Sequence, residues 1–213
     1  MDMRKKLCAA LLALSVACPS LHAQNLVNET QEQKDKRMEW FHKAKLGIFI
    51  HWGVYAVKGV SESWSFYNKY LPHDEYMKQC EGFTASKYDP KAWVELIKES
   101  GAQYTVLTTK HHDGVALWDT KQNGISVVKN TPAKRDLVTP FVNEVRKAGL
   151  RLGLYYSLPD WSHPDYPNMT RTDVRYKDDP KRWDDFCKFN FGQLKELNTT
   201  YKPDLYWFDG DWE

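Results

Sequence analysis

Apolar segments alternate with amphipathic segments along most of the chain. Four short runs rich in apolar and β-branched residues are bounded by polar or turn residues, a pattern that predicts buried strands. Three longer segments carry apolar side chains at helical spacing, and two of them stop at a glycine. The predicted strands are residues 46–51, 103–109, 150–157 and 203–209, and the predicted helices are residues 89–102, 138–149 and about 180–200. Near-continuous apolar strands separated by helices indicate a parallel sheet of the α/β class.

Polar residues gather directly after each predicted strand. In (β/α) barrels and in open α/β sheets alike, the carboxyl ends of the strands face the active site. A full barrel needs eight strand–helix units in about 250 residues, and this sequence shows four. We therefore expect the N-terminal half of a (β/α) TIM-like barrel, truncated after the fourth strand. The long segment 52–88, between the first strand and its helix, is expected to be a loop that shapes the site, because loops of this length are usually functional.

The first 23 residues have the order of a secretory signal peptide. Basic residues (Arg4, Lys5 and Lys6) precede an apolar run, and the small residue Ala23 ends the segment. The run is too short for a membrane span, which needs about 20 apolar residues. Lipidation at Cys18 is the less favoured alternative, because Ser15 stands where a bulky aliphatic side chain is preferred. We expect residues 24–213 to form one partial catalytic domain, exported to the periplasm or secreted, or lysosomal in a eukaryote.

Charge and cysteine content exclude several classes of protein once the signal is removed. Residues 24–213 carry 27 basic and 27 acidic residues, so no basic excess indicates nucleic acid or an anionic membrane as partner. Cys80 and Cys187 remain and could pair in an oxidising compartment, but two cysteines do not make a disulfide framework. Nine Trp and twelve Tyr are an unusually high content. They fit either an aromatic core or a site in which rings stack on a sugar, and composition leaves both open.

The histidines that follow the first two strands are the first candidates for chemistry. His51 ends the first strand, and the adjacent His111 and His112 follow the second. Neighbours in an extended chain point to opposite faces, so both rings can face one site only if the strand has already bent. No H-x-H or H-x-x-x-H spacing supports a metal site. No glycine-rich phosphate loop follows a strand, and the G-x-S-x-G elbow is absent, so we expect no nucleotide and no serine-hydrolase chemistry.

The carboxylates in "YWFDGDWE" (206–213) are the second set of candidates. Glycoside hydrolysis uses two carboxyl groups, and the retaining route places nucleophile and proton donor about 5–5.5 Å apart. Asp209 ends the fourth strand, so its side chain can project into the site. We interpret Asp211 and Glu213 as solvated turn residues, because Asp211 could share that face only if the strand continued past Gly210.

Four stretches together carry a resemblance to a known family. "KLGIFIHWGVYAV", "TTKHHDGVALWDT", "LGLYYSLPDW" and "PDLYWFDGDWE", in this order and spacing, resemble the N-terminal half of the retaining α-L-fucosidases of glycoside hydrolase family 29. The resemblance spans roughly residues 37 to 213. It implies hydrolysis of terminal α-linked L-fucose from fucosylated glycans, with retention at the anomeric carbon and without a cofactor.

The resemblance also implies roles for individual residues. Asp209 matches the family's nucleophile, and Trp207 matches a tryptophan that lies against the fucose. The residues that match ligands of the sugar hydroxyls are His51, His111 and His112.

Two further positions of the resemblance are less direct. Tyr155 matches a tyrosine of the site, although Tyr156 could be the one that faces it. Trp64 matches the tryptophan of a Glu-Trp-Tyr run, but here the run reads "ESWSFY". Ser63 stands where the glutamate is expected, so Glu62 either reaches the sugar through a shifted loop or the contact is lost.

The family's acid/base is a glutamate beyond the nucleophile, and no counterpart precedes Glu213. We therefore expect half of an active site. Two alternatives stay open: an inactive chain that only binds fucose, and a related barrel glycosidase that acts on another α-glycoside.

Overall fold

The computed structural model describes residues 29–166 and 179–210. These residues divide into two compact units, with the boundary between His42 and Lys43. The first unit contains most of helix α2 (Gln31–Ala44), whose side chains are largely exposed. The sequence pattern did not predict this helix, because it has no apolar stripe at helical spacing and its only buried residue is Ala44.

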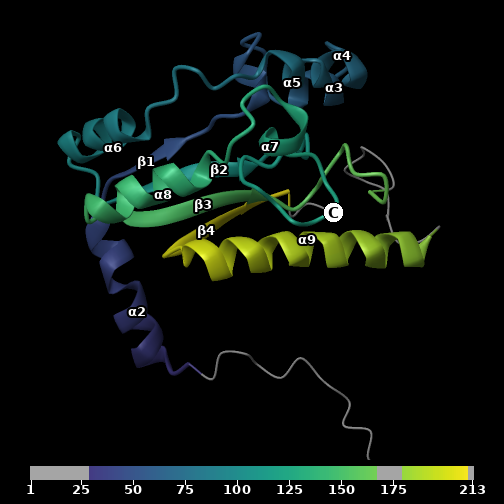
Figure 1. The fold of residues 1–213 in the computed structure, drawn as a ribbon. Helices are drawn as coiled ribbons and strands as arrows, with labels where there is room; N and C mark the ends of the chain where they lie inside the picture. Colours follow the sequence, from purple (N-terminus) through teal and green to yellow (C-terminus); the bar gives the residue numbers. More distant parts are fainter. Residues whose placement is uncertain (1–28, 167–178, 211–213) are drawn as a thin grey trace, which may run out of the picture. The chain divides into compact units, whose positions relative to one another are not determined.

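A four-stranded parallel sheet forms the centre of the second unit (Figure 1). Its strands are β1 (Gly47–Ile50), β2 (Tyr104–Lys110), β3 (Arg151–Ser157) and β4 (Leu205–Asp209). They pair in chain order, and every neighbouring pair is parallel. The four predicted strands and the parallel α/β class are therefore confirmed. Three strand–helix units followed by a fourth strand, in this order, are the arrangement of the N-terminal half of a (β/α) barrel.

Three longer helices follow the first three strands, as predicted. They are α6 (Pro90–Glu99), α8 (Val138–Lys147) and α9 (Pro180–Tyr201). Helix α6 begins where the side chain of Asp89 accepts a hydrogen bond from the Ala92 amide (3.1 Å) and Pro90 fills the first helical position. Gly149, at φ +74°, follows the end of α8. Helices α6 and α8 are shorter than predicted because caps and these turns take up their terminal residues, whereas α9 has the predicted extent.

The segment 52–88 is not a plain loop. It folds into four short helical turns, which are η1 (Val54–Ala56), α3 (Trp64–Tyr67), α4 (His73–Met77) and α5 (Gln79–Gly82). Another short helix, α7 (Val127–Asn130), follows β2. Buried Tyr76, Phe66 and Phe83 anchor these turns in the core. Burial of these rings holds the segment in one conformation. The side chains that it contributes to the candidate site are therefore fixed in place.

The two faces of the sheet have different partners. The Tyr156 hydroxyl is hydrogen-bonded to the side chains of Asn190 (2.6 Å) and Gln193 (2.8 Å) of α9, so this side chain lies on the helix-covered face. Its neighbour Tyr155 points the other way and meets Asp209. Because side chains alternate along a strand, those on one face pack against the helices and those on the other face lie near Asp209.

Some expectations lie outside the described residues: the signal peptide 1–23, lipidation at Cys18, and the turn positions Asp211 and Glu213. In the part of the chain that the structure describes, Cys80 is buried, Cys187 is exposed, and both are free thiols. No helix among those residues has the length and apolar character that crossing a bilayer requires.

Candidate active site

Asp209 lies at the carboxyl end of β4, opposite Ser157 in the register of β3 and β4. Its Oδ2 accepts a hydrogen bond from the Tyr155 hydroxyl at 2.7 Å. The same oxygen lies 3.8 Å from Nε2 of His112. In parallel (β/α) folds, catalytic side chains lie at the carboxyl ends of the strands. The Asp209 carboxylate has this position, with a phenol and an imidazole beside it.

The adjacent histidines both turn toward this region. Strand β2 ends at Lys110 after a shift in its pairing with β3, and a turn follows in which the Gly114 amide donates to the His111 carbonyl (3.0 Å). The chain has therefore bent before the histidine pair. The ring centroids of His111 and His112 lie 4.3 Å apart, and the His111 ring stacks at 5.7 Å on Tyr155.

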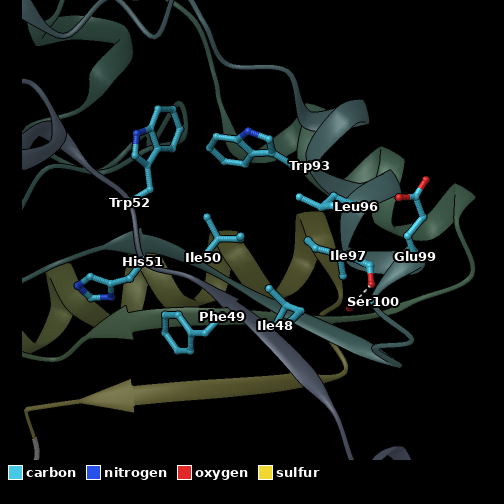
Figure 2. Close-up of a pocket in the computed structure, with 10 residues that line it drawn as sticks. All are labelled: Ile48, Phe49, Ile50, His51, Trp52, Trp93, Leu96, Ile97, Glu99 and Ser100. Atoms are coloured by element: carbon cyan, nitrogen blue, oxygen red, sulfur yellow. Dashed lines mark hydrogen bonds between the residues drawn. The ribbon is translucent and has the colours of Figure 1, made fainter.

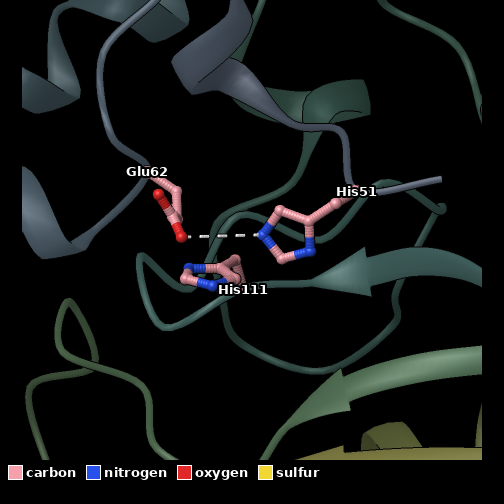
Figure 3. Close-up of side chains that lie close together, drawn as sticks. All are labelled: His51, Glu62 and His111. Atoms are coloured by element: carbon pink, nitrogen blue, oxygen red, sulfur yellow. Dashed lines mark ion pairs between the residues drawn. The ribbon is translucent and has the colours of Figure 1, made fainter. Parts of the chain in front are cut away.

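His51, Glu62 and His111 form the other side of the cluster, and Figure 3 shows the carboxylate and the two rings facing one another. Nε2 of His51 lies 4.0 Å from Oε1 of Glu62, and its ring contacts that of His111 edge-on at 4.9 Å. Glu62 thus reaches the cluster, although it stands one position before the expected glutamate. Ser63 occupies a different place, where its hydroxyl contacts Nδ1 of His111.

The two tryptophans predicted from the resemblance contact different members of this group. Trp64 contacts the His112 ring edge-on at 5.7 Å. Trp207 shares the strand face of Asp209, two residues away, and contacts Phe49 edge-on at 5.4 Å. It is 54 % exposed, which leaves much of an aromatic surface open to a ligand. The structure therefore brings every predicted site residue into one connected group.

Burial sets the protonation state of the imidazoles. Burial lowers the pKa of His112 to about 4, although the Asp209 charge opposes the shift. Burial and the neighbouring histidines hold the pKa of His111 well below its usual value. Burial also lowers the pKa of His51, against the charges of Glu62 and Asp209. The three rings are therefore neutral at pH 7, and hydrogen-bond to hydroxyls as neutral imidazoles.

A separate cavity of about 770 Å³ lies between β1 and α6. Figure 2 shows Ile48, Ile50 and Trp52 pointing toward Trp93 on α6, whereas His51 and Phe49 point to the other face of the strand. The lining of the cavity is mainly apolar; it includes His51 and Phe49 but not Asp209. It belongs to the helix-covered side of β1, and the residues of the candidate site meet on the opposite face.

The cluster could also hold a cation on geometric grounds. Two groups of three side chains offer ligand atoms within 4.8 Å of one another: His51 with Glu62 and His111, and His111 with His112 and Asp209. Their members come from separate segments, so the spacing argument in the sequence could not address them. Imidazoles and carboxylates at these distances serve a sugar's hydroxyls equally well.

Sequence reasoning missed several contributors. Phe49 packs edge-on against Tyr155 (5.8 Å), and Tyr55 stacks on His51 (5.7 Å). Two-residue alternation with His51 could have identified Phe49. No sequence signal identifies the three hydroxyl residues that contact imidazole nitrogens, Ser63, Thr108 and Ser157. Serine and threonine occur in strands and loops for many structural reasons.

Comparison with known proteins agrees with this geometry. The family model for α-L-fucosidase matches residues 14–213. An α-L-fucosidase of Branchiostoma floridae is 35 % identical over 226 residues, which cover 95 % of this chain and 47 % of that protein. The tissue α-L-fucosidase of Mus musculus is 36 % identical over 195 residues, covering 82 % of this chain and 40 % of the relative. The chain thus spans about half the length of these relatives.

Solved structures give the same picture. α-L-Fucosidase isoenzyme 1 of Paenibacillus thiaminolyticus superposes with a TM-score of 0.75 at 39 % identity, over 84 % of this chain and 44 % of the other. A family 29 α-L-fucosidase of Bacteroides thetaiotaomicron, at 37 % identity and a TM-score of 0.75 over 88 % of this chain and 44 % of the other, was solved as a trapped covalent intermediate with 2-fluoro-fucosyl fluoride in a glutamate-to-glutamine variant. This chain belongs to the α-L-fucosidase family, glycoside hydrolase family 29.

Proposed function

We propose that this chain carries the nucleophile and the main sugar contacts of an exo-acting, retaining α-L-fucosidase. Asp209 is the nucleophile in this proposal. The observation that carries it is the position of its carboxylate, which accepts the Tyr155 hydroxyl at 2.7 Å and lies among neutral imidazoles at the carboxyl end of β4. The family's names and the trapped covalent intermediate of the Bacteroides relative support the same chemistry.

In the proposed reaction, Asp209 Oδ attacks the anomeric carbon of a terminal α-linked L-fucose. The glycosidic bond breaks as the carbon–oxygen bond to Asp209 forms, and the leaving oxygen takes a proton from a general acid. Water then cleaves the fucosyl ester with overall retention. The proposal leaves the general acid unassigned.

The remaining residues bind and orient the sugar in this proposal. The neutral rings of His51, His111 and His112, together with Glu62, hydrogen-bond the hydroxyls of the fucose. Trp64 and the exposed face of Trp207 contact the apolar C–H faces of the ring.

A fluoride substrate tests the nucleophile separately from the acid. Fluoride leaves without protonation, so 2-fluoro-fucosyl fluoride should label this chain once, and peptide mass spectrometry should locate the fluorofucosyl group on Asp209. Asp209→Ala should take no label. Asp74→Asn, a change at an exposed carboxylate on α4, is the matched control and should label at the wild-type rate.

The rival functions give different outcomes. Calorimetric binding of L-fucose without labelling would favour a chain that only binds the sugar. Preference for the corresponding α-galactosyl reagent would favour another α-glycoside. A label on any carboxylate other than Asp209 would contradict the proposed mechanism.

Export completes the proposal. Residues 1–23 have the order of a signal peptide and residues 24–213 form the catalytic part. N-terminal sequencing of the protein recovered outside the cytoplasm should begin at Gln24. Recovery of the chain with Met1 intact would contradict it.

A further inference from the structure

Each of the three site histidines has a hydroxyl oxygen beside its Nδ1 atom, supplied by a different segment of the chain. The pairs are His51 with Thr108 (3.5 Å), His111 with Ser63, and His112 with Ser157 (2.5 Å). A neutral imidazole carries one proton, on either Nδ1 or Nε2, so the partner of Nδ1 decides which nitrogen is the acceptor.

The direction of the hydrogen bond is determined at Ser157. The Ser157 hydroxyl donates to the Pro159 carbonyl at 2.6 Å, and a carbonyl oxygen can only accept. A hydroxyl has a single proton, so Ser157 Oγ is an acceptor toward His112. Nδ1 of His112 must then carry the imidazole proton and donate it to Ser157.

We propose that Ser157 is a positioning residue that holds His112 in its Nδ1–H tautomer, so that Nε2 faces Asp209 as a proton acceptor. Both groups are buried, which excludes water as a competing partner. Ser157 also lies in register with Asp209 across β3 and β4, so one pair of strands positions both the carboxylate and the tautomer of its neighbour.

The tautomer matters because Nε2 of His112 lies 3.8 Å from Asp209 Oδ2. A proton on Nε2 would be donated toward the carboxylate and would reduce its nucleophilicity. With the proton on Nδ1, Nε2 presents a lone pair and donates nothing to Asp209. This consequence for the carboxylate rests on the proposed function, whereas the tautomer itself does not.

Thr108 shows the same arrangement in a weaker form. Its hydroxyl donates to the Ile50 carbonyl (3.1 Å) and accepts from the Trp52 amide (3.3 Å), which leaves it an acceptor toward His51. The contact of 3.5 Å to His51 is at the limit of a hydrogen bond. Ser157 is therefore the residue to test.

Nitrogen-15 spectra of the histidine rings measure the tautomer directly. In the full 213-residue chain at neutral pH, the His112 signals, assigned by their loss in His112→Gln, should show the Nδ1–H pattern. Their Nδ1 proton should exchange slowly with solvent. An Nε2–H pattern for His112 would overturn the proposal without any variant of Ser157.

Variants then assign the effect to Ser157. Ser157→Ala should lose the Nδ1–H pattern in favour of Nε2–H or a mixture, and Ser157→Thr, which keeps the hydroxyl, should retain it. Thr109→Val is the matched control, because it removes a buried hydroxyl–carbonyl hydrogen bond (2.6 Å to the Tyr155 carbonyl) that touches no imidazole. An unchanged tautomer in Ser157→Ala would overturn the role of Ser157.

These measurements need no substrate. Failure of the fluoride reagent to label Asp209, with the Nδ1–H pattern intact, would remove the proposed function and leave the tautomer inference standing. Labelling of Asp209 together with an Nε2–H pattern for His112 would support the proposed function and overturn the tautomer inference.

Discussion

The ammonium group of Lys110, one residue before the histidine pair, is completely buried. Its Nζ lies 3.4 Å from Asp160 Oδ2 and 3.2 Å from Asn190 Oδ1, and it sits over the Tyr156 ring at 4.5 Å. Burial lowers the pKa of Lys110, and the Asp160 charge opposes that shift. Because both charges of the pair are desolvated, each depends on the other.

Lys110→Met should therefore lower the free energy of unfolding by about 3–5 kcal/mol, since it leaves the Asp160 carboxylate buried without its cation. Urea denaturation followed by tryptophan fluorescence measures the change. The double variant Lys110→Met with Asp160→Asn should recover much of the loss, because no unpaired charge remains. A double variant as unstable as the single one would show that packing, and not charge, causes the effect.

Tyr155 and Tyr156 show what the sequence leaves open at the scale of a residue. The pattern places both on a buried strand, and alternation guarantees that they face opposite ways, but it does not say which faces the site. Contacts from α9, distant along the chain, fix the answer. The histidine pair poses the same problem, because the bend that turns both rings inward depends on a shift in strand pairing that no local pattern encodes.

At the scale of elements, the start of α6 depends on one side chain. Asp89 accepts from the Ala92 amide and satisfies one of the unpaired donors of the first turn. Asp89→Ala should cost about 1 kcal/mol in the free energy of unfolding, and Asp89→Asn, which keeps a capping oxygen, should cost much less. Equal losses in the two variants, measured by thermal or urea unfolding, would contradict the capping role.

The strands and long helices were predictable because their signals are local. Apolar runs, helical spacing and terminal glycines depend only on near neighbours. The turns in 52–88 were not predictable, since Tyr76 and Phe66 are buried by residues distant in sequence. Glu62 illustrates the limit: its displacement by one position could be read from the sequence, but its return to His51 is a property of the folded loop.

For the molecule as a whole, the lowered pKa values predict loss of stability in acid. His112 has a pKa of about 4 when folded and 6.5 when unfolded, so the unfolded state binds more protons between these values. Its contribution to stability is complete above pH 6.5 and is lost as pH falls toward 4, on the order of 3 kcal/mol. Burial also lowers the pKa of His51, His73, His111 and His163, which adds to the loss. Urea midpoints measured across this window should fall with pH.

Protonation of Asp113 opposes this loss of stability in acid. Burial raises the pKa of this carboxyl to about 6 against hydrogen bonds from Tyr76 and the Val115 amide, so the folded state takes up its proton first as pH falls. Asp113→Asn removes that opposing contribution and should make the loss of stability between pH 6 and 4 steeper. A shallower dependence in this variant would contradict the assignment.

The edges of the sheet predict self-association. Strands β1 and β4 have a partner on one side only within the described residues, and exposed Leu96 (69 %) and Phe191 (71 %) lie on the helices α6 and α9. Leu96→Lys combined with Phe191→Lys should lower the sedimentation coefficient at high concentration. Tyr70→Lys, at an exposed residue of the 52–88 segment, is the control and should leave it unchanged. A wild-type sedimentation coefficient that does not change with protein concentration would contradict the predicted self-association.

The face of the sheet on which Asp209 lies depends on its position in the pairing of β3 with β4. One additional residue inside β4, between Leu205 and Tyr206, would turn Asp209 and Trp207 toward α9 and bring Tyr206 and Phe208 into their place, whereas two additional residues would restore the original orientation one step further along. Within the strand, only an even number of added residues keeps the Asp209 carboxylate on the same face of the sheet. The number of residues in the strand, as much as the identity of the acid at its end, decides on which face of the sheet that carboxylate lies.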